Sequence, residues 1–291
     1  MKTFVVCLTL FFAAQCFRYE SSEFQKSEAN GECPEWSYSG DNGPEHWGSL
    51  CTAYATCSEG KVQSPIDIRS SKADEDEIEV DIYSHNEHEL TFLNNGHTVE
   101  VEFTDEYIEE NYIILDDSDK FNLHQFHFHT PSENSLDGHH FNMEVHFVHA
   151  NEAGELAVLG VFVDAPNNDV SCDFLDELLN NLPENEGDEN EVNFNVNSFI
   201  KFDDNTEYFR FMGSLTTPPC TEGVNWIVKR NPLRCSKTQV EEVFEILHVS
   251  NRPIQPKNSR TVFLGSNKTD PDDDDNTSNT SNTSNTSNTS N

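Results

Sequence analysis

The stretch Gln125-Phe126-His127-Phe128-His129 alternates phenylalanine with polar side chains at a period of two residues. In a β-strand, successive side chains point to opposite faces, so Gln125, His127 and His129 share one face and the two phenylalanines share the other. Two imidazoles spaced in this way can both reach one metal ion at the Zn–N distance of about 2.0–2.1 Å. The stretch therefore predicts a strand with one apolar face and one metal-binding face.

A second segment, 143–149, supplies the third ligand that such a site requires. It carries His146, with Glu144 on the same strand face. Three neutral histidines leave a fourth position of the metal open for water, which is the ligand set of a catalytic zinc. The alternative for each histidine taken singly is an ordinary hydrogen-bonded residue of the core or surface. A zinc hydrolase of another kind would be expected to show His-Glu-x-x-His or carboxylate ligands, and neither pattern occurs.

The surrounding sequence is typical of a mainly β (α+β) single domain. Residues 98–103 alternate apolar with polar and predict a strand with one wet face, whereas 156–163 are continuously apolar and predict a strand buried on both faces. Residues 174–182 and 236–247 have apolar positions three and four apart, which predicts short helices. Residues 184–191 are acidic and contain glycine, which predicts a loop.

The composition excludes several classes of function. The chain has 291 residues, with 17 Lys and Arg against 53 Asp and Glu, and a formal net charge of −36. Such a chain is repelled by nucleic acid and by anionic membranes, so neither is an expected partner. With 35% hydrophobic residues and 21 phenylalanines, it is also too rich in core-forming side chains for a disordered acidic protein.

Both ends of the chain look like segments outside the folded domain. Residues 1–16 have Lys2, a short apolar run and a small-residue site near Cys16, which predicts a cleaved signal peptide and secretion, and 17–32 form an N-terminal extension. The alternative for the apolar run is a buried strand or helix.

Residues 267–291 are Asp-rich and then repeat Asn-Thr-Ser, which predicts a disordered tail without a membrane anchor. The tail carries six candidate N-glycosylation sites, at Asn267, Asn276, Asn279, Asn282, Asn285 and Asn288. The alternative is an unmodified tail.

Six cysteines remain after the leader, which fits three disulfides in an exported chain. They are Cys33, Cys51, Cys57, Cys172, Cys220 and Cys235. Spacing alone does not choose among the 15 pairings that six cysteines allow. No Cys-x-x-Cys pair occurs, which argues against a cysteine-rich zinc module.

Several separated motifs together identify a family. In chain order they are Trp36-Ser-Tyr38, Asn42-Gly-Pro-Glu-His-Trp47, Gln63-Ser-Pro-Ile-Asp-Ile68, Asn94-Asn-Gly-His97, Phe126-His-Phe-His-Thr-Pro-Ser-Glu133, Met143-Glu-Val-His-Phe-Val-His-Ala-Asn151, Gly213-Ser-Leu-Thr-Thr-Pro-Pro-Cys220, Trp226 and Asn251-Arg-Pro-Ile-Gln-Pro256. With these motifs, residues 33–266 resemble the α-class carbonic anhydrases. The segment between His129 and Glu133 is short, as in bacterial, algal and invertebrate secreted members. The resemblance implies a large, mostly antiparallel, twisted central sheet with short peripheral helices.

The resemblance also implies an activity and its residues. His127, His129 and His146 match the ligands of one Zn²⁺ per chain, and Gln125 and Glu144 match groups that accept hydrogen bonds from ligand imidazoles. The implied reaction is reversible hydration of CO2 to bicarbonate and a proton by a zinc-bound hydroxide. Thr216 matches the threonine that accepts from this hydroxide and holds substrate, Glu133 the carboxylate that takes the Thr216 proton, and Thr217 a neighbour on the cavity wall. The implied CO2 pocket is apolar, and ordinary core packing is the alternative for its members Val148, Val158, Leu215, Val224 and Trp226.

The same resemblance implies a proton path and one disulfide. His97 matches the proton-shuttle histidine, for which a plain turn residue is the alternative, and Tyr38 and Asn95 match residues that hold the water chain. Glu100 stands where Asn or Gln is common in the family. Cys57 and Cys220 match a disulfide of secreted members.

The acidity keeps a second function open. The chain could be an acidic extracellular or mineral-matrix protein of the same family in which catalysis is secondary. Calcium or carbonate mineral would then bind the acidic surface. Neither the sequence nor the resemblance fixes the oligomeric state.

Overall fold

The computed structural model describes residues 33–75, 80–83, 88–116, 119–166, 170–196 and 206–266, and every structural statement below refers to these. The predicted signal peptide (1–16), the N-terminal extension (17–32) and the tail (267–291), with its six candidate glycosylation sites, lie outside the described residues. Among the helices that are described, none has the length and apolar character needed to cross a membrane.

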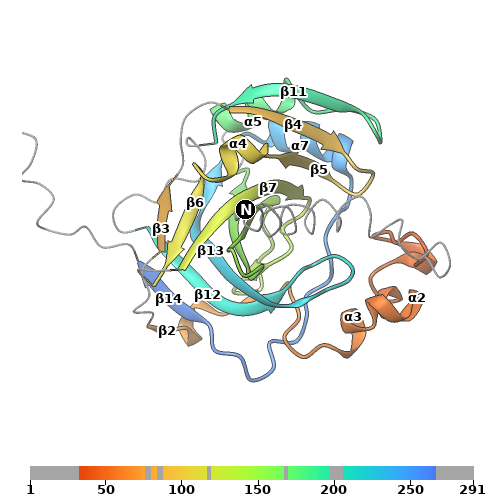
Figure 1. Ribbon diagram of the computed structural model, residues 1–291, viewed down its shortest axis with the longest axis vertical. Helices are drawn as coiled ribbons and strands as arrows, with labels where there is room; N and C mark the ends of the chain where they lie inside the picture. Colours follow the sequence, from red (N-terminus) through yellow and green to blue (C-terminus); the bar gives the residue numbers. More distant parts are fainter. Residues whose placement is uncertain are drawn as a thin grey trace, which may run out of the picture.

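A 12-stranded sheet forms the body of the protein and curves strongly around its centre (Figure 1). From one edge to the other, its main path runs through β11 (Glu189–Phe194), β4 (His88–Asn94), β5 (Val99–Glu102), β7 (Asp119–His129), β9 (Met143–Ala150), β10 (Leu156–Asp164), β13 (Glu222–Arg234), β12 (Glu207–Ser214), β14 (Phe263–Ser266) and β2 (Asp74–Glu75). Off this path, β6 (Tyr112–Leu115) pairs with both β7 and β3 (Val80–Tyr83). Most neighbours are antiparallel, while β10–β13 and β14–β2 are parallel. The expected mainly β class is confirmed, and the sheet is mixed.

Short elements lie around this sheet. They are the 3₁₀ turns η2 (Gly40–Asn42), η3 (Thr52–Tyr54) and η4 (Ser70–Lys72), the helices α2 (Trp47–Leu50), α3 (Thr56–Glu59), α4 (Asp105–Ile108), α5 (Asp173–Leu179) and α7 (Lys237–Leu247), and the strand pair β1 (Asp67–Ile68) with β8 (Ser135–Leu136). Figure 1 shows α5 and α7 near β4 and β5, with α2 and α3 set apart on another side. The helices are short and peripheral, as expected.

Both predicted helices are present, but only one of them ends where the sequence predicted. Helix α7 begins directly after Ser236, whose hydroxyl accepts from the Gln239 amide while the Gln239 side chain accepts from the Ser236 amide, so the helix has a capping box. Helix α5 ends at Leu179, three residues before the expected end. The side-chain amides of Asn180 and Asn181 donate to carbonyls of the preceding turn and so terminate the helix early.

Two other expectations need correction. Strand β5 forms, but its polar face is not wet, because Glu100 is only 9% exposed and lies opposite His127 of β7. The predicted loop 184–191 ends early, because β11 begins at Glu189 and pairs with β4. Strand β11 is an edge strand with mostly exposed side chains, so the acidic composition that suggested a loop is compatible with pairing on one side only.

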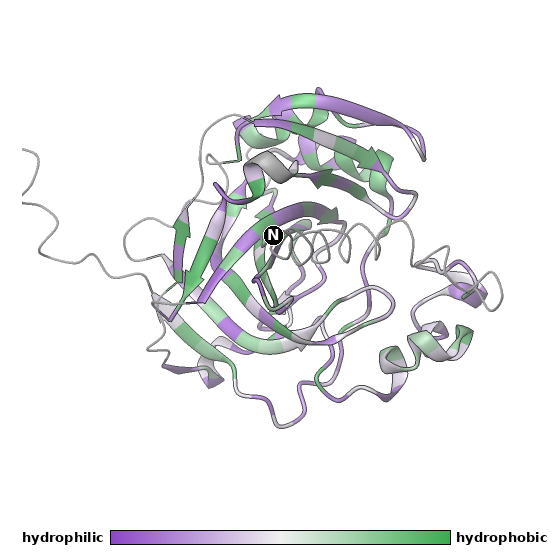
Figure 2. Ribbon diagram, viewed as in Figure 1, coloured by the Kyte–Doolittle hydropathy of each residue, from purple (hydrophilic) through white to green (hydrophobic). Residues whose placement is uncertain are grey.

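Hydrophobic and hydrophilic residues alternate along several strands (Figure 2). The buried apolar side chains form three clusters, of which two lie against the central strands. Phe126, Phe128 and Phe147 lie in the larger cluster with residues of α5 and α7. Val148 and Trp226 lie in a second cluster on the other side of the central strands. Strand β10 is buried along almost its whole length between β9 and β13, as its continuous apolar sequence predicted.

All six cysteines of the described chain form disulfides. Cys57 pairs with Cys220, as the resemblance implied. The pairings that the sequence left open are Cys33–Cys51 and Cys172–Cys235. The last of these joins the N-terminal ends of α5 and α7, since Cys172 directly precedes α5 and Cys235 precedes the capping Ser236.

Candidate metal centre

Three histidines from two neighbouring strands converge on one point. Strand pairing places His127 of β7 opposite His146 of β9, and His129 lies two residues further along β7. One nitrogen from each imidazole lies within 4.8 Å of the other two, which makes a cluster able to hold a metal ion. The alternation along β7 explains the geometry, because the phenylalanines between the histidines pack into the larger core on the opposite face.

Each imidazole has an oxygen near the ring nitrogen that is turned away from the cluster. Nδ1 of His127 is 2.8 Å from Oε1 of Gln125, and Nδ1 of His129 is 2.5 Å from the carbonyl oxygen of Ser250. Nε2 of His146 is 3.3 Å from Oε1 of Glu144. The oxygens of Gln125 and Ser250 fix the rings of His127 and His129, whereas Nε2 of His146 is near Glu144 without forming a hydrogen bond. Nε2 of His127, Nε2 of His129 and Nδ1 of His146 would then be the nitrogens available for a metal.

Glu144 is itself held rigidly. Its two carboxylate oxygens accept from the main-chain and side-chain amides of Asn134, at 2.7 and 2.8 Å. Gly160 of β10 leaves room for it, because a Cβ at Gly160 would lie 2.9 Å from Oε1 of Glu144. A larger residue at this position would push against the carboxylate that lies near His146.

Burial keeps the three histidines neutral. Desolvation lowers the pKa of His129 to about 4, and it also lowers the pKa values of His127 and His146 well below the usual range. The mutual repulsion of the imidazoles adds to this lowering for His127 and His146. At neutral pH each ring therefore presents a lone pair, which a metal ligand requires.

Glu133 lies behind the histidines and meets Thr216. Its Oε2 is 3.5 Å from Nε2 of His129 and 3.9 Å from Nδ1 of His146. Burial raises the pKa of Glu133 to about 8, while the Arg252 amide, at 2.7 Å from Oε1, and the Thr216 hydroxyl act in the opposite direction by hydrogen bonding. Glu133 and Thr216, which the resemblance implied act together although they are far apart in the sequence, are thus in contact.

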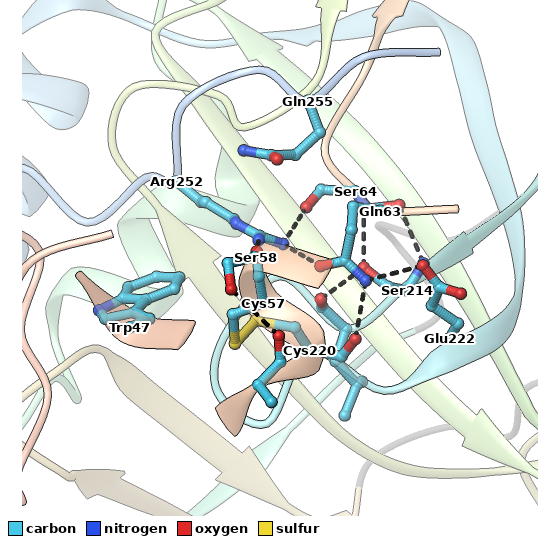
Figure 3. Close-up of a disulfide and its surroundings, with 12 residues drawn as sticks. Trp47, Cys57, Ser58, Gln63, Ser64, Ser214, Cys220, Glu222, Arg252 and Gln255 are labelled. Atoms are coloured by element: carbon cyan, nitrogen blue, oxygen red, sulfur yellow. Dashed lines mark hydrogen bonds between the residues drawn. A yellow bond between two sulfur atoms is a disulfide. The ribbon is translucent and has the colours of Figure 1, made fainter. Parts of the chain in front are cut away.

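The side chain of Arg252 ties this region to a disulfide (Figure 3). The residue is 1% exposed, and its guanidinium donates to the side chain of Gln63 and to the carbonyl oxygens of Ser64 and Cys57, at 2.7–2.9 Å. Cys57 is bonded to Cys220, in the segment that carries Thr216. One buried cation therefore connects the Glu133 contact, the disulfide and the loop of Thr216.

The predicted CO2 pocket residues do gather beside the histidines. Val148 pairs across strands with Val158, which in turn pairs with Trp226. The Trp226 ring lies 4.8 Å from the His146 ring between centroids. Four of the five predicted members belong to the second apolar cluster, and the partly buried fifth, Leu215, packs against it; the four are Val148, Val158, Val224 and Trp226. Thr217 is half-buried next to Thr216.

The predicted proton-path residues lie near one another. The His97 ring stacks on Trp36, with centroids 3.8 Å apart, and Trp36 also contacts Tyr38. Asn95 accepts from the His97 amide through its side-chain oxygen and donates to Oε2 of Glu100 at 3.2 Å. Burial raises the pKa of Glu100 to about 7 and that of Tyr38 well above its usual range.

Sequence reasoning did not assign roles to three groups of this centre. The Ser250 carbonyl orients His129, the Asn134 amides hold Glu144, and Arg252 holds the surrounding loops. Arg252 lies in a motif that the sequence analysis quoted, so its position was visible there although its contacts were not. A main-chain carbonyl such as that of Ser250 leaves no signal in a sequence, because every residue has one.

Comparison with known proteins gives consistent matches. The family model of eukaryotic-type carbonic anhydrases matches residues 42–266. The carbonic anhydrase of Pectobacterium carotovorum is 36% identical over 231 residues, which cover 78% of this chain and 89% of that protein. The solved α-carbonic anhydrase of Thermovibrio ammonificans, in complex with the inhibitor sulfanilamide, aligns with a TM-score of 0.71 and 37% identity over 80% of this chain and 100% of its own. That of Photobacterium profundum is 40% identical, with a TM-score of 0.68 over 79% of this chain and 100% of its own.

Proposed function

The chain belongs to the eukaryotic-type carbonic anhydrase family and catalyses the hydration of CO2, and on that premise we propose that it does so as a secreted enzyme with one Zn²⁺ held by His127, His129 and His146. The observation that carries the proposal is the convergence of three imidazole nitrogens within 4.8 Å. We also propose that protons leave the site through His97.

The residues present fit a zinc ion. Three neutral nitrogen donors form the ligand set of a catalytic zinc, with one position open. The inward Nε2 of His129 and the nearby Oε2 of Glu133 are buried without a hydrogen-bond partner. Buried polar atoms are costly when they are left unpaired, so a cation at this point would satisfy the ligand nitrogen and stabilise the carboxylate.

The protein positions the reactants around this ion. When bound, Zn²⁺ would lower the pKa of a water molecule from far above neutrality to about 7, as is known for this enzyme family, and would so supply a nucleophile at neutral pH. Glu133 accepts a hydrogen bond from the Thr216 hydroxyl, which leaves an oxygen lone pair of Thr216 to accept a hydrogen bond from the attacking group. That arrangement fixes the direction of attack and requires Glu133 to be ionised. The donors from Arg252 and Thr216 and the charge of a nearby cation all favour that state.

The apolar cluster beside His146 would hold CO2. The molecule carries no charge, and the side chains of Val148, Val158 and Trp226 present an almost fully buried apolar wall. An apolar wall binds CO2 without competing for it by hydrogen bonds and binds bicarbonate poorly, which favours release of the charged product. Thr216 and Thr217 provide polar contacts at the edge of this wall.

A test combines metal content with kinetics. We expect about one zinc per chain by metal analysis and CO2 hydration in stopped flow, with both lost in His127→Ala. His46→Ala is the matched control, because His46 is exposed at the start of α2 and its side chain makes no cap. A folded native chain that takes up no zinc would refute the proposal. Sulfanilamide should inhibit the native enzyme, as the name of the Thermovibrio ammonificans complex suggests for that relative.

We infer that the protein is exported. Three disulfides support this, because such bonds persist in oxidising compartments. Expression in a eukaryotic secretory host should yield a mature protein in the medium that begins near residue 17. Its mass should fall after treatment with an N-glycosidase if the tail is glycosylated. Intracellular retention of an uncleaved chain would contradict the inference.

The acidic surface suggests calcium or carbonate mineral as a further partner. A cation-binding role driven by the tail can be tested by deleting residues 267–291 and measuring adsorption to calcium carbonate powder. Reduced adsorption with unchanged CO2 hydration is the expected result. Equal adsorption of both forms would contradict a role for the tail.

A further inference from the structure

Two carboxylates that the proposed function leaves unused act on the His97 imidazole by their charge, and one of them packs against the turn that carries it. Glu35 immediately precedes Trp36, on which His97 stacks, and Glu186 belongs to the segment between α5 and β11. Both glutamates are exposed, whereas His97 is half-buried. Burial lowers the pKa of His97, and the charges of Glu35 and Glu186, which are the charged groups acting on it in the described structure, raise it.

Glu186 is seated directly against the turn that carries His97. Gly96 has φ +82°, and a Cβ added there would lie 2.8 Å from Cδ and 3.0 Å from Oε1 of Glu186. The residue before His97 is therefore free of a side chain on the side where the carboxylate packs. The positive φ independently favours glycine at this position.

Hydrogen bonds hold the two segments together. The amide of Gly187 donates to the Asn94 carbonyl at 2.8 Å, and the amide of Asn94 donates to the Asp188 carbonyl at 3.1 Å. The Asn94 side chain also donates to the Pro183 carbonyl at 3.2 Å. The backbone on both sides of Glu186 is thus fixed to the strand end that precedes His97, so the carboxylate is not on a free loop.

We propose that Glu186, assisted by Glu35, is a positioning residue for proton release, whose carboxylate stabilises the protonated imidazole of His97. The inference rests on the proposed function, in which His97 takes a proton from water in the cavity and gives it to a buffer base outside. One N–H bond forms and the same bond breaks, so the carboxylates are not consumed.

The physical need for these charges follows from the position of His97. Desolvation against Trp36 disfavours the imidazolium, and a poorly basic imidazole accepts protons from the cavity too rarely. A fixed carboxylate nearby compensates for the desolvation, and the face of an indole also favours a cation. Because both glutamates are exposed, the stabilisation is modest and should weaken as salt screens the charges.

The test uses the full-length metal-loaded enzyme and four variants. Glu186→Gln, Glu35→Gln and their combination each remove charge while keeping shape, and Glu184→Gln removes an exposed charge from the same segment as the control. The first readout is the pKa of His97 from the NMR titration of its ring proton, assigned with His97→Ala. We expect the pKa to fall by roughly 0.3–0.5 in each single variant and further in the double variant at low salt. No change is expected in the control. An unchanged His97 pKa in the double variant would overturn the proposal.

The second readout separates proton release from the chemistry on CO2. Proton release follows the interconversion of CO2 and bicarbonate, so the Gln variants should lower kcat about twofold and leave kcat/KM unchanged. A shifted pKa with native kcat in the double variant would overturn the positioning role. His97→Ala tests the proposed function separately. If that variant keeps the native kcat, His97 is not the proton carrier, while the NMR titration still reports whether Glu186 stabilises its protonated form.

Discussion

Glu100→Gln should stabilise the protein above neutral pH. Burial of Glu100 raises its pKa from the ordinary 4.5 to about 7, the charge of Glu102 adds to the increase, and the hydrogen bond from Asn95 opposes it. Glutamine keeps an oxygen for Asn95 and removes the charge. Glutamine also has nearly the same size and shape as glutamate, so the substitution disturbs the packing little.

The magnitude follows from the two pKa values. Below pH 4.5 the carboxyl is protonated in both folded and unfolded states, and its contribution is fully present. Between pH 4.5 and 7 the unfolded chain loses the proton while the folded chain keeps it, so the stability falls as the pH rises. Each pKa unit corresponds to about 1.36 kcal/mol, and the loss above pH 7 is therefore about 3 kcal/mol.

The assay is urea unfolding of the metal-free protein at pH 5 and pH 8, because a cation on the histidines would itself favour the ionised carboxylate. We expect Glu100→Gln to match the native protein at pH 5 within about 1 kcal/mol and to exceed it by about 3 kcal/mol at pH 8. Glu89→Gln, an exposed position on the adjacent β4, is the control and should change little. Equal free energies of unfolding for Glu100→Gln and the native protein at pH 8 would refute the reasoning.

Three further variants test individual contacts by the same unfolding measurement. Replacing Cys172 and Cys235 by alanine removes a cross-link between residues 63 apart and should cost about 4 kcal/mol in the chain-entropy estimate, and no loss relative to native protein would contradict it. Ser236→Ala removes the acceptor for the Gln239 amide and should lower the free energy of unfolding by about 1 kcal/mol. An unchanged urea midpoint would show that this cap does not contribute to stability. Arg252→Met leaves the main-chain carbonyls of Ser64 and Cys57 without their donor, so it should lower the free energy of unfolding by roughly 3–5 kcal/mol and also lower kcat. A variant that is as stable and as active as the native protein would contradict this expectation.

The cluster of three histidines was predictable because it depends on local order. A period of two residues puts His127 and His129 on one strand face in any sheet, and the phenylalanines between them show which face is packed. The third ligand needed only that β7 and β9 pair, which their short separation in the chain favours. The pattern of β7 therefore determines much of the site before any long-range contact is known.

Features that depend on distant segments were missed or misjudged. The acceptor for His129 is a carbonyl 121 residues away, and no local pattern indicates it. Glu100 was expected on a wet face, because a polar side chain that lines a site alternates in the same way as one that meets water. The early end of α5 depends on whether the amides of Asn180 and Asn181 turn back to the helix, and periodicity does not show that.

Formal charge treats all 53 acidic residues alike. The buried carboxylates near the histidines nevertheless differ in the hydrogen-bond donors that surround them. Glu144 accepts amides from Asn134, and Glu133 accepts a main-chain amide and the Thr216 hydroxyl. Glu100 has only one side-chain donor acting against its desolvation. A buried carboxylate is costly unless hydrogen bonds compensate it, so the three should respond differently to glutamine. Burial raises the pKa of all three carboxyls, so what distinguishes them is the donors around them. At Glu133 and Glu144 the NH₂ group of glutamine would meet existing donors and destabilise the fold, whereas at Glu100 the oxygen of glutamine can still accept from Asn95 and removal of the charge stabilises it.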